Sequence, residues 1–250
     1  MDKLIDLTSE SDFHYQSFGS SHSYIKYSSN TKWSPFYLLK SNSILSEHNR
    51  QSLSFGDIFQ GNFEFAILSN YMIDLSFIFS ECERFLCPDV ITLILHGSKS
   101  SEESLKSQLE NMGLPNVFIS LVEVSEAFGT HHCKYALLFY ENGVRVVITT
   151  ANYLDHDFYD MTQGVYVQDL PLLDKSHSNL EKNKNNFKKD LLSFLHQTKI
   201  KEPFCRQLFK DQFQRFDSYD FSLAEVEIIA SVPGTPIKKL KKKSFKSVLI

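Results

Sequence analysis

The sequence predicts an α/β fold with a mixed central sheet, because buried strands alternate with a helix and one strand pair forms a hairpin. Val90 to His96 (VITLILH) is a continuous apolar run rich in β-branched residues, which is typical of a buried strand. A helix pattern and a second strand follow it. The stretch from Thr130 to Thr150 then reads as an antiparallel hairpin. Strand, helix, strand and hairpin is an α/β pattern, with the hairpin at the centre of the sheet.

Composition describes a globular chain. Its 250 residues allow one large domain or two small ones, and 42% apolar content with 22 Phe supports a substantial core. No apolar run reaches the length of a membrane span, and the acidic N-terminus lacks a signal-peptide core. The four cysteines show no paired metal spacing, so reduced intracellular thiols are expected. No metal or other cofactor is expected, because no acidic or Cys/His cluster accompanies the motifs.

The N-terminal third begins with residues 1–33, which are rich in Ser, Asn and Tyr without periodicity and predict a disordered leader. The chain turns apolar from Trp33 to Leu45, so one domain is expected over residues 34–234. Leu53 to Phe59 resembles a connection leading into a helix. Phe63 to Phe79 is nearly all apolar, which predicts burial on several sides.

The elements that follow are bounded by clear start and stop signals. Ser98 to Met112 predicts a helix, with acidic residues in its first turn and Gly113 just past its end. Val117 to Val124 predicts a strand. The hairpin strands are expected at Thr130–Tyr140 and Val144–Thr150, joined by a turn at Asn142-Gly143.

The last third is expected to carry two helices between strands. Further strands are predicted at Gly164–Val167 and Val226–Val232, a polar loop at Asp174–Asn186, and helices at Phe187–Thr198 and Pro203–Phe216.

Two side chains of the first hairpin strand suit phosphate chemistry. Alternation along a strand places His132 and Lys134 on one face, and His131, Cys133 and Tyr135 on the other. An imidazole can attack phosphorus or hold a proton near neutral pH, and an ammonium is a compact charge for a phosphoryl oxygen.

A carboxamide such as Asn152 could donate to a second phosphoryl oxygen. With a two-residue turn in strict register, however, Asn152 pairs with Cys133 and faces away from His132. The interpretation therefore requires the second hairpin strand to end, or to bulge, near Thr150.

These residues carry a family resemblance. His132-Cys133-Lys134 followed by Asn152 resembles the His-x-Lys…Asn motif of the phospholipase D superfamily. The flanking words AFGTHHCK, RVVITTAN and MTQG resemble one branch, the tyrosyl-DNA phosphodiesterases. LILHGSK (Leu93–Lys99) and SVPG (Ser231–Gly234) extend the likeness more weakly, so that it covers about Asn62 to Gly234.

The resemblance implies a phospholipase D-like α/β/α sandwich, one half of a pseudo-dimer whose two halves each donate a motif. It implies that His132 is a nucleophile forming a phosphohistidine, that Lys134 and Asn152 bind phosphate, and that Gln163 supports the site. Phe128 would stack on a base. The implied reaction is metal-free hydrolysis of a 3′-phosphodiester between DNA, single- or double-stranded, and a tyrosine of a trapped topoisomerase-derived peptide.

Other interpretations stay open. An isolated His-x-Lys on a strand is usually an exposed His and Lys, Gln163 would equally suit a turn, and Phe128 would suit a core. His131 and Cys133 are expected to be structural. The family acid is a second His in a second motif, which this sequence lacks. The chain could therefore be a truncated, silent half-site acting as a binding or scaffold module, or a homodimer in which two copies of His132 face each other.

Residues 235–250 are strongly basic, unlike the rest of the sequence. They carry six lysines and no acid, which leaves 20 basic and 30 acidic residues in positions 1–234. Such a basic tail could contact the phosphate backbone of a nucleic acid or act as a nuclear localisation signal. The alternative is a solvated, disordered chain end. A nuclear location, with a cytoplasmic fraction, and no membrane contact are expected. The acidic body argues against a broad nucleic-acid-binding face.

Overall fold

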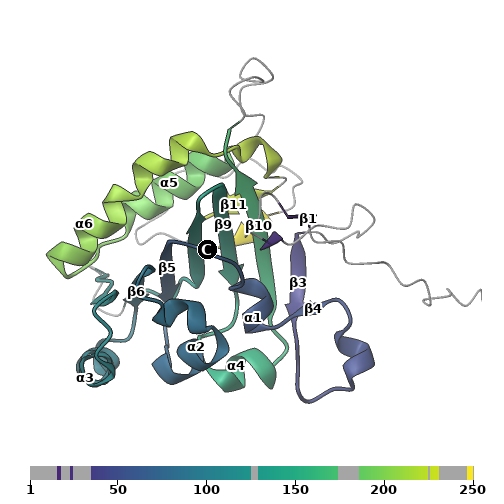
Figure 1. Ribbon diagram of the computed structural model, residues 1–250, viewed down its shortest axis with the longest axis horizontal. Helices are drawn as coiled ribbons and strands as arrows, with labels where there is room; N and C mark the ends of the chain where they lie inside the picture. Colours follow the sequence, from purple (N-terminus) through teal and green to yellow (C-terminus); the bar gives the residue numbers. More distant parts are fainter. Residues whose placement is uncertain are drawn as a thin grey trace, which may run out of the picture.

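The computed structural model describes residues 35–124, 129–173, 186–224 and 226–230, together with the backbone of three short strands at 16–17, 23–24 and 247–249. Its centre is an eight-stranded sheet of order β4-β3-β10-β9-β8-β5-β6-β7 (Figure 1). The strands are β3 Phe36–Leu39, β4 Ser52–Leu53, β5 Phe65–Asn70, β6 Ile91–His96, β7 Val117–Leu121, β8 Tyr135–Tyr140, β9 Gly143–Thr149 and β10 Gly164–Pro171.

The sheet is mixed, as the sequence predicts. Strands β5, β6 and β7 run parallel, whereas β8, β9, β10 and β3 pair antiparallel in turn, and β4 lies parallel to β3. The β8–β9 hairpin occupies the two middle positions of the sheet, so its ends lie among other strands rather than at an open margin. Two small two-stranded sheets pair β1 (Gln16–Ser17) with β2 (Ser23–Tyr24) and β11 (Glu227–Ile229) with β12 (Ser247–Leu249).

Helices cover both faces and make the sheet the middle of three layers. On one side Figure 1 shows α5 (Phe187–Gln197) with α6 (Pro203–Asp211); on the other lie α1 (Phe55–Ile58), α2 (Leu75–Glu81), α3 (Glu102–Met112) and α4 (Asp155–Tyr159). The short 3-10 helices are η1 Ser46–Asn49, η2 Glu83–Leu86, η3 Lys99–Ser101, η5 Phe213–Ser218 and η6 Phe221–Leu223.

Two hydrophobic cores follow from the alternation of strand side chains. In β8, Leu137 and Phe139 pack into the core under α5, whereas Ala136 and Leu138 pack into the core under α1 and α2. All six residues of β8 are buried, because the strand is covered on both faces.

The predicted strand and helix after Val90 are confirmed. β6 begins one residue later than predicted, and β7 ends at Leu121 rather than at Val124. Helix α3 begins at Glu102 rather than at the predicted Ser98, because η3 precedes it, and Gly113 just past its end takes the left-handed φ of 62° that favours glycine. Most of the apolar run from Phe63 to Phe79 is buried as predicted, but it contains β5 and the start of α2, because Asp74 caps a new helix within it.

Two details of the hairpin prediction were wrong. β8 begins at Tyr135 rather than at Thr130, and Tyr140 pairs with Gly143, so the turn residues are Glu141 and Asn142. Gly143 is instead the first residue of β9. A Cβ at Gly143 would lie 2.6 Å from the carbonyl oxygen of Leu170 in β10, so the close approach of the neighbouring strand requires this glycine.

The C-terminal predictions were partly wrong in their bounds. The helix predicted to reach Phe216 ends at Asp211 and is followed by η5, and β10 continues past Val167 to Pro171. The predicted loop at residues 174–185, the SVPG segment and most of the predicted leader and basic tail lie outside the described residues. No helix in the described ranges is both long and apolar enough to cross a bilayer.

Candidate active site

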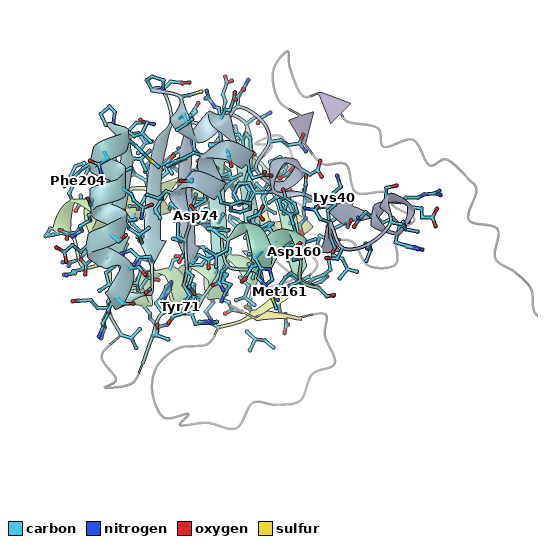
Figure 2. The ribbon with its side chains drawn as sticks, turned by 90° about the horizontal axis from the view of Figure 1, so that it is seen from below. Lys40, Tyr71, Asp74, Asp160, Met161 and Phe204 are labelled. Atoms are coloured by element: carbon cyan, nitrogen blue, oxygen red, sulfur yellow. The ribbon has the colours of Figure 1, made fainter. Side chains whose placement is uncertain are left out.

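The predicted site residues gather at one edge of the sheet. Because β8 and β10 run opposite to β5, β6 and β9, the starts of the former lie beside the ends of the latter. Residues 131–134 lead into β8, Asn152 follows β9, and Gln163 precedes β10. Figure 2 labels Tyr71, which follows β5 at this edge, and Met161, which lies between α4 and β10.

His132 and Lys134 lie together, as predicted, although their segment is extended chain that precedes β8. The Nζ of Lys134 lies 3.0 Å from Nδ1 of His132 and 3.4 Å from Nε2, and it also donates to the His132 carbonyl oxygen at 3.2 Å. Lys134 is 7% exposed, whereas His132 is exposed to solvent. A buried ammonium thus lies beneath an accessible imidazole.

The electrostatics of this pair favour a neutral imidazole. Burial, and then the charge of Lys134, lower the pKa of His132 below its ordinary value of 6.5. Burial also lowers the pKa of Lys134, while the negative charge of Asp157 opposes that effect. Because an ammonium can only donate, the imidazole nitrogen facing Lys134 must be the one that carries a lone pair.

The second hairpin strand, β9, ends at Thr149, as the predicted position of Asn152 in the site requires. Thr149 closes β9 by donating its N–H to the carbonyl oxygen of Lys134 at 3.0 Å. The chain then leaves the sheet and pairs with the loop after β5 through a bridge between Ile73 and Tyr153. Asn152 therefore does not continue the pleat, and the requirement for a strand end near Thr150 is met.

The side chain of Asn152 is held by two neighbours. Its Nδ2 donates to Oδ2 of Asp157 at 2.7 Å, and its Oδ1 accepts the N–H of Met72 at 3.4 Å. Gln163 lies one strand further along the edge, where its Oε1 accepts a hydrogen bond of 2.5 Å from Thr150. The hydrogen bonds of Gln163 within the described chain run to Thr150 and Leu39 rather than to the other predicted site residues.

His131 has the structural environment that the sequence predicts. Its Nε2 lies 2.8 Å from the hydroxyl of Ser69, and only 7% of the residue is exposed. Burial, followed by the charges of His132 and Lys134, lowers the pKa of His131 to about 4, so the ring is neutral at neutral pH. Cys133 packs against the core under α5, and burial raises the pKa of its thiol to about 11. Phe128 lies outside the described residues.

Two residues of this edge were not found from the sequence. The ring of Tyr71 lies 4.8 Å from that of His132, and Asp157 accepts both the backbone N–H and the side-chain N–H of Asn152. An aromatic residue directly after a buried strand, and an acid five residues after Asn152, were the available signals. Within the described ranges, no group of three or more His, Cys, Asp or Glu side chains is placed to hold a metal ion.

Comparison with known proteins assigns the family. The model of the tyrosyl-DNA phosphodiesterase family matches residues 35–245. The chain belongs to the tyrosyl-DNA phosphodiesterase family. It is 32% identical over 207 residues to tyrosyl-DNA phosphodiesterase 1 of Arabidopsis thaliana, which covers 80% of this chain and 33% of that protein. The protein of the same name from Drosophila melanogaster is 28% identical over 177 residues, or 70% of this chain and 29% of the relative.

The fold agrees with that of a solved member of the family. The crystal structure of the yeast tyrosyl-DNA phosphodiesterase superposes with a TM-score of 0.55 at 17% identity, over 76% of this chain and 43% of the yeast chain. The predicted phospholipase D-like α/β sandwich with a mixed sheet is thereby confirmed. The chain spans about a third of the length of the curated relatives it matches.

Proposed function

We propose that this chain cleaves the phosphodiester bond between a 3′ end of DNA and a tyrosine, through a phosphohistidine on His132. The observation that carries the proposal is the 3.0 Å contact between the accessible imidazole of His132 and the buried ammonium of Lys134. Membership of the tyrosyl-DNA phosphodiesterase family supports the same substrate class.

In the structure, the ammonium of Lys134 donates to the lone pair of the His132 imidazole. An anionic phosphoryl oxygen is a stronger acceptor than a neutral imidazole, so a bound phosphodiester draws the ammonium toward itself and frees the lone pair. The imidazole nitrogen then attacks phosphorus. A nitrogen–phosphorus bond forms, the bond from phosphorus to the tyrosyl oxygen breaks, and the electron pair leaves on that oxygen, which needs a proton.

Lys134 and Asn152 stabilise the negative charge that develops on the phosphoryl oxygens in the transition state. One N–H of the Asn152 carboxamide is used by Asp157, and the other can donate to a phosphoryl oxygen. The carboxamide of Asn152 is held by the fold before substrate arrives, which is the arrangement that stabilises a transition state. In the second step a water oxygen attacks phosphorus, the bond to His132 breaks, and the DNA 3′-phosphate leaves.

Protonation of the leaving group limits this chain. The sequence contains one His-x-Lys…Asn set, and general acid assistance is worth about 10²–10⁴ in rate. We expect the tyrosyl ester to be cleaved slowly. A p-nitrophenyl ester at the same 3′-phosphate should be cleaved much faster, because p-nitrophenolate needs no proton to leave.

The test compares both 3′-esters on the purified full chain and detects the covalent intermediate by intact-mass spectrometry. His132→Ala should abolish the adduct and the cleavage of both esters, whereas His48→Ala, an exposed histidine in η1, should change neither. Equal and rapid cleavage of both esters would show that a proton donor operates in this chain after all.

Absence of both turnover and adduct in the wild-type chain would contradict catalysis and favour the silent binding module. The molar mass in solution, measured by light scattering, decides the homodimer alternative. Rapid cleavage by a dimer, but not by a monomeric variant, would show that two copies of His132 share one site.

We also propose that the protein acts on damaged DNA in the nucleus. The six lysines of residues 235–250 support this location, since clustered Lys is typical of nuclear addresses and phosphate contacts. Replacement of all six by Gln in a fluorescent fusion should shift the protein toward the cytoplasm. An unchanged distribution would contradict the role of the cluster.

A further inference from the structure

Asp157 in α4 is a half-buried carboxylate that binds Asn152 twice. Its Oδ2 accepts the backbone N–H of Asn152 at 3.0 Å and the side-chain Nδ2 at 2.7 Å. Two donors from one residue converge on one oxygen, so both the backbone and the rotamer of Asn152 are tied to the first turn of α4.

This contact decides which way the carboxamide of Asn152 points. Its Oδ1 faces the N–H of Met72, and its Nδ2 faces Asp157. Rotating the amide by half a turn would place Nδ2 against the Met72 N–H and Oδ1 against a carboxylate, which pairs donor with donor and acceptor with acceptor. The second Nδ2 proton is used by no hydrogen bond that the structure describes and is left for a ligand.

Asp157 also acts on the other phosphate-binding side chain. Burial disfavours the charged form of Lys134, and Asp157 is the acid whose charge most opposes that effect. The remaining titratable groups facing Lys134 are His131, His132 and Cys133, all of its own segment. Of these, the neutral histidines and the protonated thiol supply no compensating negative charge at neutral pH.

We propose that Asp157 is the positioning residue of the phosphate site and that it orients the carboxamide of Asn152. The inference rests on the proposed function, because it takes the terminal phosphate of a nucleic-acid strand as the ligand. Asp157 contacts neither the phosphate nor the reacting atoms; it acts through Asn152.

Electrostatic repulsion between Asp157 and the phosphate would change the binding affinity in the opposite direction. A carboxylate close to a phosphate repels it, and if that repulsion dominated, removal of the charge would tighten binding. If positioning dominates, removal of the charge weakens binding, because a neutral amide oxygen holds the two N–H groups of Asn152 less firmly than a carboxylate does. The sign of the change in affinity therefore separates the two.

The experiment measures the dissociation constant of a 3′-phosphorylated oligonucleotide for the full chain by fluorescence anisotropy. We expect Asp157→Asn to weaken binding about tenfold, the loss typical of one hydrogen bond to a charged group. Asp155→Asn is the matched control, since it removes the same charge from an exposed position in the same turn of α4, and it should change affinity less than twofold. Melting curves establish that each variant is folded.

Two further measurements separate positioning from a general structural role. In an Asn152→Ala background, Asp157→Asn should lose most of its effect, because the group to be oriented is already gone. In NMR titrations of the free chain, Asp157→Asn should lower the pKa of Lys134, whereas Asp155→Asn should not, and this readout needs no ligand.

Unchanged or tighter binding by Asp157→Asn, or an equal loss in both backgrounds, would overturn the role of Asp157. A wild-type chain that does not bind the oligonucleotide would instead overturn the proposed function on which the inference rests. If Asp157→Asn does not fold, the comparison in the two backgrounds is made with Asp157→Glu, whose extra methylene group displaces the carboxylate from Asn152; an equal loss in both backgrounds would again contradict the inference.

Discussion

Substitution of Gly97 by Ala should disable the site without touching any residue that contacts substrate. Gly97 directly follows β6, and its N–H donates to the carbonyl oxygen of Asn70 at 3.1 Å. A Cβ at Gly97 would lie 2.8 Å from the carbonyl carbon of His131, closer still to its oxygen, and 3.2 Å from the ring of Tyr71. The His131 backbone and the Tyr71 ring together leave no room for a methyl group.

The size of the effect follows from the displacement that the methyl group forces. Real Cβ contacts under 3.0 Å are essentially never seen, so the His131 carbonyl must withdraw by roughly 1 Å. His132 and Lys134 follow immediately in the chain and must move with it. A misplacement of about 1 Å can cost about 10²-fold in rate. Overpacking of this kind also costs about 1–3 kcal/mol in stability.

The assay is the rate of covalent adduct formation with the 3′-p-nitrophenyl ester, measured beside urea unfolding. Gly56→Ala is the control, because its Cβ would lie 3.7 Å from the nearest atom, the Glu81 carbonyl oxygen, which is an ordinary contact. Gly97→Ala should lose about 10²-fold in rate, whereas Gly56→Ala should keep it. An adduct rate equal to wild type, with or without lost stability, would refute the link between Gly97 and the position of His132.

Three further outcomes follow from buried polar groups. Ser69→Ala removes the partner of His131 at 2.8 Å, and should lower the free energy of unfolding by about 1–3 kcal/mol in urea; an unchanged midpoint would mean that water replaces the hydroxyl. The pKa of His131 is about 4 in the folded chain, against an ordinary value of 6.5. Between pH 7 and pH 5 the unfolded chain therefore binds a proton that the folded chain does not bind, and the free energy of unfolding should fall by about 2 kcal/mol. His131→Gln should flatten that slope in pH-dependent unfolding, and an identical slope would contradict the assignment. Asp169 pairs with the fully buried Arg145 at 2.6 Å, so Asp169→Asn removes the counter-charge of Arg145 and should lower the free energy of unfolding by about 3 kcal/mol. Asp89→Asn removes an acid from an exposed ion pair and should leave the unfolding midpoint unchanged.

The local sequence pattern was sufficient to predict several strands and helices and the pairing of His132 with Lys134. The run from Val90 to His96 has no polar face, so burial on both sides follows from its composition alone. Gly113 ends α3 with the left-handed conformation that the helix pattern predicts. His132 and Lys134 are two residues apart in an extended segment, so they share a face whether or not the segment is hydrogen-bonded into the sheet.

Contacts between distant parts of the chain were decided only by the tertiary structure. Gly97 and Gly143 are required because His131 and Leu170, far away in the sequence, approach their Cα atoms closely. The sequence alone assigned Gly143 to a turn, since a local pattern carries no information about a neighbouring strand. Tyr71 lies beside His132, which is far away in the sequence, because β5 pairs with β8. The sequence therefore determined which groups are available for phosphate chemistry, and strand order and register, which depend on the packing of the whole sheet, decided which of them meet.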